Sequence, residues 1–231
     1  MKSEAKSFWR GAADILPLAV SAAVFGAVYG MTSRRFGFPL WSVAAMSLMI
    51  FAGSSQFMAA NVLYGGAGPL STVATIGIVN LRMLLLSTAL NERVKDRFSL
   101  RQRLIGAFFL TDESFVTYYG SLGETAPSAG RYMGASLTIY IFWICSCVAG
   151  YQFGAFLPER VAALLSFAFP ATFAAMVAPQ IKTKPAVVAA LVAAVTAVIC
   201  YLLIPGKTYI IAGCFAGSLA GVLAQPRGDR V

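Results

Sequence analysis

PLWSVAAMSLMIFAGSSQFMAANVLYGG, residues 39–66, is an apolar stretch with a polar break in its middle. The break consists of Gly53, Ser54 and Ser55, and the apolar runs on both sides are short. A helix needs about 20 residues to cross the hydrocarbon core of a bilayer. Broken backbone at membrane depth is tolerated only where protein buries it or where it lines a cavity. The stretch therefore predicts an interrupted helix at a protected polar site.

The rest of the chain is equally apolar. Of its 231 residues, 58% are hydrophobic and 12% are charged, and the mean hydropathy is +0.75. Soluble domains carry about 25% charged residues. We therefore expect an all-α, polytopic membrane protein with seven or eight transmembrane segments in a single membrane-embedded domain over residues 1–231. The apolar segments are about 12–32, 39–64, 67–90, 104–121, 131–151, 160–180, 185–204 and 208–224.

The net charge of +9 does not indicate a nucleic-acid partner. Basic residues interleaved with aromatic ones do not form a face outside the apolar segments, and an excess of Lys and Arg in short loops is what membrane insertion requires. The N-terminus resembles a signal peptide. Its apolar run continues for about 20 residues and contains Asp14 and Pro17, which favours an uncleaved first helix.

Two further segments contain internal breaks. Asn80 and Arg82 interrupt the third segment, and Pro170 lies in the middle of the sixth, where a proline removes a backbone hydrogen bond. FAGSSQFMAA at 51–60 also aligns with FAFPATFAAM at 167–176, which is a weak internal similarity. Paired interrupted segments in two halves of a chain are typical of a transporter's binding site.

The basic residues leave the orientation open. The loop at 91–103 is rich in Lys and Arg and is expected to be cytoplasmic, as is the N-terminal tail. Three full crossings between them would place them on opposite sides. Either one of the first three segments is re-entrant, with the second as our candidate, or the tail lies outside.

Four charged residues lie inside the apolar segments: Asp14, Arg82, Asp112 and Glu113. Each costs roughly 2.5–3.5 kcal/mol at the centre of a spanning helix. Asp112 and Glu113 are adjacent and point about 100° apart on a helix. One of them can face a cavity as a proton relay or as the counter-charge for a substrate ammonium. Alternatively, one of them neutralises Arg82 or caps a helix that starts there.

Three smaller interpretations concern the remaining polar residues. Gly53, Ser54, Ser55 and Gln56 would form a half-helix N-terminus that suits a substrate carboxylate, unless a serine only caps the helix. Asn80 and Arg82 would bind substrate or pair with a charge inside the membrane, unless Arg82 snorkels to the interface. Asp14 is expected to be interfacial or an N-cap.

Enzyme, cofactor and metal chemistry are not expected. The chain has no histidine, which argues against a Ser/His triad or a metal site, and its four cysteines lie in apolar segments as small hydrophobic fillers. The stripe Gly213-x-x-x-Gly217-x-x-x-Gly221 predicts close helix packing, as scaffold or as a subunit contact.

FAGSSQF at 51–57, Asn-Leu-Arg at 80–82 and LTDESF at 110–115 resemble the signature stretches of the AzlC family, the large subunits of branched-chain amino-acid exporters. Their order and spacing and the chain length agree, so the resemblance covers essentially the whole chain. Relatives usually carry His after the arginine, where this chain has Met83. The difference counts against any coupling mechanism that depends on that histidine.

The resemblance implies a secondary transporter, or permease, in the bacterial cytoplasmic (inner) membrane. It would export branched-chain or other hydrophobic amino acids, coupled to protons, together with a small AzlD-type membrane subunit. Substrate would contact Gly53, Ser54, Ser55, Gln56, Asn80 and Arg82, and Asp112 or Glu113 would couple a proton or bind the ammonium. The aliphatic side chain would meet Phe51, Phe57 and Phe115. The alternatives are a passive channel for small solutes and a non-transporting membrane scaffold.

Overall fold

The computed structural model describes residues 2–66, 68–122, 126–156, 174, 178, 181–203 and 208–225. Within these ranges the regular structure is helical throughout, without a strand. Four of the described helices are long and apolar enough to cross a membrane, namely those within Glu4–Arg35, Pro69–Val94, Ala129–Phe153 and Lys184–Leu203. The expectation of an all-α, polytopic membrane protein with interrupted helices is confirmed. Pro170 and, apart from residue 174, the second half of the proposed internal similarity at 167–176 lie outside the described residues.

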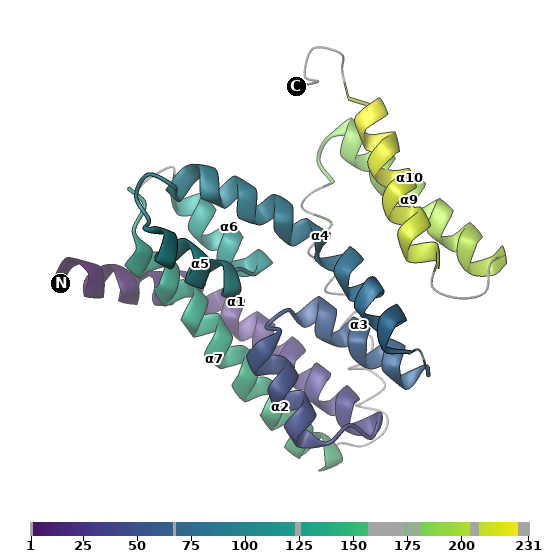
Figure 1. Ribbon diagram of the computed structural model, residues 1–231, viewed down its shortest axis with the longest axis horizontal. Helices are drawn as coiled ribbons and strands as arrows, with labels where there is room; N and C mark the ends of the chain where they lie inside the picture. Colours follow the sequence, from purple (N-terminus) through teal and green to yellow (C-terminus); the bar gives the residue numbers. More distant parts are fainter. Residues whose placement is uncertain are drawn as a thin grey trace. The chain divides into compact units, whose positions relative to one another are not determined.

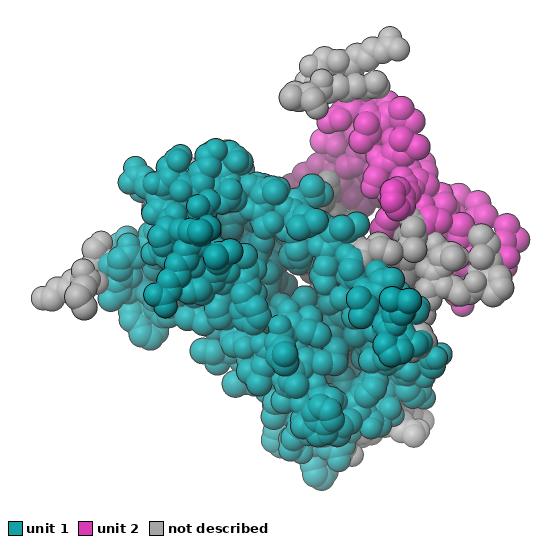
Figure 2. All heavy atoms as spheres, in the orientation of Figure 1, with its two compact units in different colours: residues 1–168 teal, residues 169–231 magenta. Residues whose placement is uncertain are grey.

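The chain divides into two compact units, Met1–Ala168 and Phe169–Val231 (Figure 2). The second unit contains α9 (Lys184–Leu203) and α10 (Thr208–Leu223), which pack against each other. A Cβ added at Gly217 would lie 2.6 Å from the Cβ of Ala193, so the small residue permits the close approach. The glycine stripe therefore serves packing within this unit, as the sequence predicted.

In the first unit, α1 (Lys2–Arg35) and α7 (Ala129–Phe153) form a closely packed parallel pair (Figure 1). Near the start of both helices, a Cβ on Gly134 would meet the backbone carbonyl of Phe8. Near their ends, a Cβ on Gly150 would meet the carbonyl of Ala27. Because contacts advance together along both sequences, the two helices run in the same direction. Glycines on both helices let the backbones touch, and this pair supports the rest of the unit.

The apolar stretch at 39–66 forms two short helices, α2 (Leu40–Met49) and α3 (Gly53–Tyr64). We call residues 40–64 the first hairpin. The ring of Tyr64, at the end of α3, stacks on Phe36 at the end of α1, with ring centroids 4.0 Å apart. The first hairpin therefore begins and ends at the same end of the unit, and the predicted interruption is confirmed.

Helix α4 (Pro69–Val94) is continuous, and the break expected at Asn80 and Arg82 is wrong. The surrounding residues are mostly good helix formers, and neither polar side chain competes with the helix backbone, because both are bound by another helix. Arg82 lies near the midpoint of α4. Its side chain reaches across to neighbouring elements and does not snorkel along its own helix.

The segment at 104–121 is broken, which the sequence raised only as the alternative of a helix that starts near Asp112 and Glu113. It forms parts of α5 (Leu100–Phe108) and α6 (Asp112–Ser121), and we call residues 100–121 the second hairpin. Arg103, near the start of α5, donates to Asn91 at the end of α4 at 3.1 Å. Tyr119, near the end of α6, lies under the guanidinium of Arg93, 5.4 Å from the ring centroid. Both ends of the second hairpin therefore lie at the end of α4.

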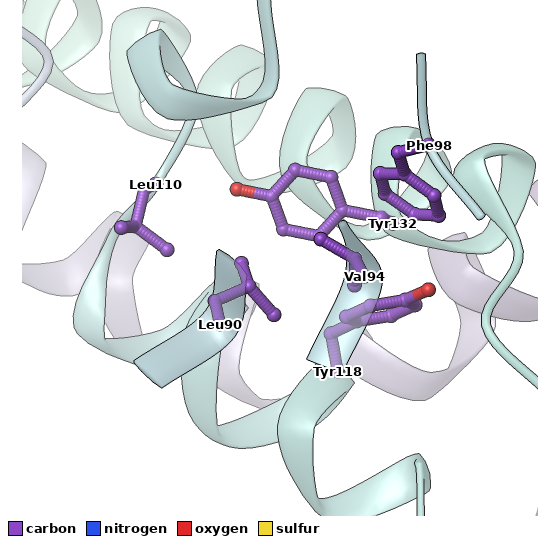
Figure 3. Packing of buried hydrophobic residues seen from close by; sticks show 6 residues of the cluster. All are labelled: Leu90, Val94, Phe98, Leu110, Tyr118 and Tyr132. Carbon is purple, nitrogen blue, oxygen red and sulfur yellow. The ribbon is translucent and has the colours of Figure 1, made fainter. Parts of the chain in front are cut away.

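Buried aromatic and aliphatic side chains hold this end together. They form one cluster from α4, α6, α7 and the connections between helices: Leu90, Val94, Phe98, Leu110, Tyr118 and Tyr132 (Figure 3). Tyr118 also accepts a hydrogen bond from the backbone N–H of Ser128 at the start of α7. Glu4 of α1 accepts another from Gly130. The starts of α1 and α7 thus share one end of the unit with the end of α4.

We call this end the basic end, because the loop at 91–103 lies there, and the other the opposite end. The first hairpin enters from the opposite end and the second from the basic end, as Figure 1 shows. With the first hairpin re-entrant, α1 and α4 are the two crossings between the N-terminal tail and the basic loop. Both basic segments then lie on one side of the membrane, which supports a cytoplasmic location for both.

The glycine contacts between α1 and α7 predict a difference between two Gly→Ala variants. Gly150→Ala places a methyl group against the backbone of Ala27 and should lower stability by about 1–3 kcal/mol, as overpacking does. Gly77→Ala in α4 meets no atom within 4 Å and should be neutral or stabilising. Thermal unfolding in detergent measures both, and equal melting temperatures would contradict the close contact.

The positions of the hairpins predict the sidedness of three single cysteines in an otherwise cysteine-free chain. Lys6→Cys and Asp96→Cys, both exposed near the basic end, should react with a membrane-impermeant maleimide from the same face. Tyr64→Cys, at the opposite end, should react only from the other face. Labelling of positions 6 and 96 from different faces would show that residues 40–64 cross the membrane completely.

Candidate functional site

The tips of the two hairpins meet beside the middle of α7. Phe51 lies at the tip between α2 and α3, and Phe109 at the tip between α5 and α6. Their ring centroids are 6.4 Å apart, and both contact Tyr140 of α7, at 4.8 and 5.2 Å. The hydroxyl of Tyr140 also donates to the backbone carbonyl of Leu48 at 2.9 Å. Tyr140 thus connects the two tips.

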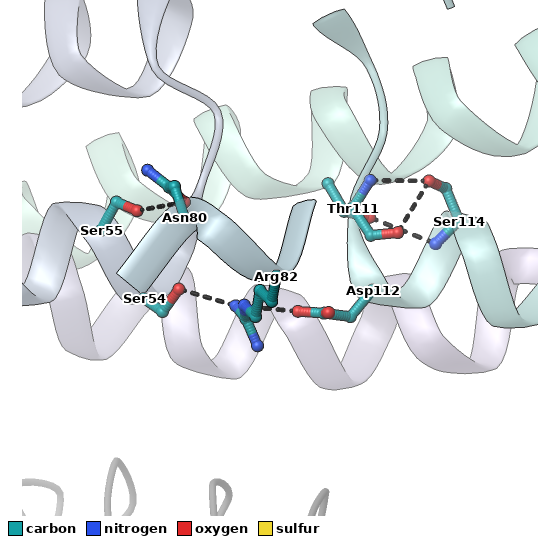
Figure 4. A network of polar contacts seen from close by, with 7 residues as sticks. All are labelled: Ser54, Ser55, Asn80, Arg82, Thr111, Asp112 and Ser114. Carbon is teal, nitrogen blue, oxygen red and sulfur yellow. Dashed lines mark hydrogen bonds and ion pairs between the residues drawn. The ribbon is translucent and has the colours of Figure 1, made fainter. Parts of the chain in front are cut away.

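Two half-helices begin next to these tips, because α3 starts at Gly53 and α6 at Asp112. Arg82 of α4 joins them (Figure 4). Its Nη2 donates to Ser54 Oγ at 2.8 Å and forms an ion pair with Asp112 Oδ2 at 2.9 Å. We call this Ser54–Arg82–Asp112 contact the bridge. It connects the first hairpin, the long helix α4 and the second hairpin through a single guanidinium.

The bridge neutralises two of the four charges in the apolar segments. The side chains of Arg82 and Asp112 are 37% and 23% exposed, so protein covers most of the pair. An Arg or Asp near the middle of a bilayer costs several kcal/mol unless it is paired, and here each finds the other. Nε of Arg82 is buried and makes no hydrogen bond within the described part of the chain. This buried N–H is therefore an unused donor of the guanidinium.

A second polar contact holds the start of α3 against α4. Ser55 Oγ donates to Asn80 Oδ1 at 2.8 Å. Neither serine caps α3: the N-cap is Ala52, which provides no side-chain acceptor. The first backbone N–H groups of α3 therefore lack a side-chain cap, and the positive end of the helix dipole lies at this point. The sequence alternative of a plain serine cap is wrong for both residues.

Gln56 is fully buried and joins three helices. Its Nε2 donates to Ser47 Oγ of α2 at 3.0 Å, and its Oε1 accepts from Trp143 Nε1 of α7 at 2.9 Å. The indole of Trp143 also lies beneath Gly53, where an added Cβ would come within 2.6 Å of the ring. Gln56 was expected to bind substrate. With both ends of its amide engaged, its geometry fits a supporting role for the start of α3.

The start of α6 is capped differently from that of α3. Thr111 and Ser114 form reciprocal side-chain bonds to each other's backbone N–H, at 3.2 and 2.9 Å. Asp112 points towards Arg82 and forms an ion pair with it, while the cap of α6 is Thr111. Glu113 is half-buried, and none of the ion pairs among the described residues involves it. The two adjacent carboxylates therefore differ in environment.

Asp14 is not an N-cap. It lies within α1 and forms an ion pair with Arg131 Nη2 of α7 at 2.7 Å. Phe57 is buried and contacts Tyr29 with ring centroids 5.3 Å apart, while Phe115 stacks on Tyr119 at 4.9 Å. These two phenylalanines therefore belong to helix packing, whereas Phe51 lies beside the bridge.

Sequence reasoning missed the contributions of α7 to the site. Tyr140 and Trp143 are three residues apart, on one face of the helix, and both carry a polar group on an aromatic ring. In a spanning helix, a buried Tyr or Trp usually finds a hydrogen-bond partner, and that was the available signal. The partners, Leu48 and Gln56, lie about 90 residues earlier in the sequence, so spacing along the chain gave no indication of them.

Discontinuous helices that meet at a polar centre within a helical membrane protein are typical of transport proteins. The comparisons with known proteins agree with this class. Residues 17–157, which contain both hairpins, match the family model described as AzlC protein. Because the match covers more than half of the chain, the protein belongs to the AzlC family.

The relatives share most of their length with this chain. The inner membrane protein YgaZ of Escherichia coli is 28% identical over 225 residues, covering 94% of this chain and 90% of the relative. The branched-chain amino acid transport protein AzlC of Bacillus subtilis is 27% identical, covering 92% and 82%. An uncharacterized membrane protein of Archaeoglobus fulgidus is 30% identical, covering 94% and 95%. No solved structure matches the chain.

Family membership and fold together define a multi-pass protein of the inner membrane with a role in membrane transport of a small molecule. The family model covers the bridge, both hairpin tips and the α7 residues that contact them. Of the residues that the sequence singled out, hydrogen bonds and an ion pair bring together Ser54, Ser55, Asn80, Arg82 and Asp112.

The bridge predicts coupled effects on stability. Arg82→Gln or Asp112→Asn alone leaves one charge without its partner, and each should lower the melting temperature in detergent. The double variant removes both charges and should recover part of the loss, which corresponds to a coupling energy of about 0.5–3 kcal/mol. Transport should not recover with stability, since the guanidinium itself is missing.

The exposed pair Lys95–Glu92 provides the matched control, because its side chains are 45% and 67% exposed. The same double-mutant cycle there should give a coupling energy of about 0–1 kcal/mol. Strictly additive effects of Arg82→Gln and Asp112→Asn on stability would show that the two side chains do not interact in the membrane protein. Full transport by the double variant would favour a purely structural role for the two charges.

Proposed function

We propose that this protein is a secondary transporter that exports branched-chain or other hydrophobic amino acids by alternating access. The observation that carries the proposal is the bridge, in which one arginine joins the starts of two half-helices from opposite hairpins. The name of the Bacillus subtilis relative supports branched-chain amino acids as the substrate class. The direction of transport rests on the family resemblance.

The substrate carboxylate is assigned to the start of α3. Ser54, the N–H groups that Ala52 leaves without a side-chain cap, and the guanidinium of Arg82 are donors close together. The N-terminus of a half-helix favours an anion, and a guanidinium can bind a carboxylate through two parallel hydrogen bonds. An arriving carboxylate would therefore compete with Asp112 for Arg82.

The ammonium or the coupled proton is assigned to the second hairpin. A carboxylate bound to Arg82 would release Asp112 from its ion pair, and Glu113 is already outside the ion pairs of the described residues. Either residue can then pair with the substrate ammonium or take up a proton. Phe51 and Tyr140 provide an apolar surface beside the bridge for the aliphatic side chain. Because the chain has no histidine, we assign proton handling to these carboxylates.

We further expect a small AzlD-type membrane subunit to be required for full activity. The exposed face of α4 is apolar, with Leu81, Leu84 and Leu85 all more than half exposed. Such a face suits lipid as well as another membrane helix. Expression with and without the subunit separates these possibilities. If the subunit is required, its absence lowers the transport rate, whereas if only lipid covers this face, the rate stays the same.

Efflux of preloaded leucine or valine tests the assignment. Asp112→Asn/Glu113→Gln should reduce efflux at least tenfold, because both acceptors for a proton or an ammonium are lost. Asp96→Asn, an exposed acid in the basic loop, is the matched control and should leave efflux unchanged. Full efflux from the double variant would overturn the role of the carboxylates.

The single variants separate proton coupling from binding of the substrate ammonium. Glu113→Gln is expected to abolish the response to an imposed pH gradient, while exchange of internal for external leucine continues. Asp112→Asn is expected to impair both. Saturation and counterflow would mark a carrier, whereas flux that rises without saturation would mark a channel.

A further inference from the structure

The first unit contains two equivalent arms. Each arm is a long helix followed by a hairpin of two short helices: α1 with the first hairpin, and α4 with the second. The tips align as FAGSSQF at 51–57 and FLTDESF at 109–115, with phenylalanine at both ends of each stretch. Position 51 corresponds to 109 and position 54 to 112, an offset of 58 in both pairs (109 − 51 and 112 − 54).

The two arms are inverted relative to each other. Helix α1 runs from the basic end to the opposite end, whereas α4 runs back, since α1 starts beside α7 and α4 ends beside the second hairpin. The first hairpin then enters from the opposite end and the second from the basic end. Transporters built from inverted repeats place their sites where the repeats meet, which here is the bridge.

In both arms, a phenylalanine comes three residues before the side chain that binds Arg82. Phe51 precedes Ser54, and Phe109 precedes Asp112. Both rings contact Tyr140, so an aromatic cluster joins the two tips. The two rings therefore belong to hairpins that enter from different ends of the unit.

Phe51 is also held in an unusual conformation. Its φ is 42°, in the left-handed region that a bulky residue rarely adopts, and the residue is only 4% exposed. Such strain persists where the surroundings impose it, and it is concentrated at switch regions and binding sites. Here the rings of Tyr140 and Phe109 surround the residue. Movement of the first hairpin away from Tyr140 would release this conformation.

We propose that Phe51 and Phe109 are the two gates of the transport path, one for each face of the membrane. Separation of the first hairpin from Tyr140 would remove Phe51 and open the bridge towards the opposite end. Separation of the second hairpin would remove Phe109 and open it towards the basic end. This inference extends the alternating access of the proposed function and assigns its two steps to equivalent residues.

Accessibility of a cysteine beside the bridge tests the gates without any substrate. The reporter is Ala52→Cys, at the tip of the first hairpin, in a cysteine-free chain. An impermeant maleimide is applied to right-side-out spheroplasts and to inside-out vesicles, and the rate of labelling is measured. Phe51→Ala should accelerate labelling several-fold from the face at the opposite end only. Phe109→Ala should do so from the face at the basic end only.

Val116→Ala is the control, because Val116 lies in α6 of the second hairpin and is 64% exposed, and it should not change labelling. If an alanine variant does not fold, as judged by size-exclusion chromatography, Phe51→Leu and Phe109→Leu replace it, with the same sidedness expected. The gates are overturned if both variants accelerate labelling from the same face. They are also overturned if folded variants accelerate labelling from neither face. Because labelling needs no substrate, failed leucine efflux with intact sidedness would overturn the substrate and leave the gates in place.

Discussion

The contact of Arg82 with Ser54 and Asp112 is the constraint on which the arrangement of the first unit depends. A guanidinium near the midpoint of a spanning helix has to find an anion at the same depth, since water is absent there. Asp112 can reach that depth only because the chain turns back in the second hairpin. Ser54 does so because the chain turns back in the first. The two interruptions and the buried arginine therefore explain one another.

The parallel pair of α1 and α7 gives both hairpins a rigid support. Glycines bring the two backbones into contact, and α7 then presents Tyr140 and Trp143 to the hairpins. Trp143 binds Gln56 of the first hairpin, and Tyr132 donates to the carbonyl of Gly106 in the second. Each hairpin is thus attached to the same helix by an aromatic side chain with a hydrogen bond. The polar starts of α3 and α6 are connected through Arg82.

The break at Gly53 could be predicted because glycine and two serines interrupt an apolar run, which is a local signal. The continuity of α4 could not, because Asn80 and Arg82 are satisfied by Ser55, Ser54 and Asp112, about 25 to 30 residues away. The break before α6 was raised only as one alternative because no glycine or proline stands at 109–112, although Thr111 and Ser114 have the spacing of a capping pair. The repeat escaped notice because its offset of 58 preserves few identities beyond the phenylalanines.

The two arms are equivalent in shape but not in charge, and this difference suits a zwitterion. At corresponding positions, the first hairpin has Ser54 and Ser55 where the second has Asp112 and Glu113. The start of α3 has no side-chain cap, whereas Thr111 and Ser114 already satisfy the start of α6. One tip therefore offers donors to an anion and the other offers carboxylates to a cation or a proton. A substrate with a carboxylate and an ammonium needs both, and Arg82 can exchange its bond to Asp112 for one to the substrate without leaving its own charge unpaired.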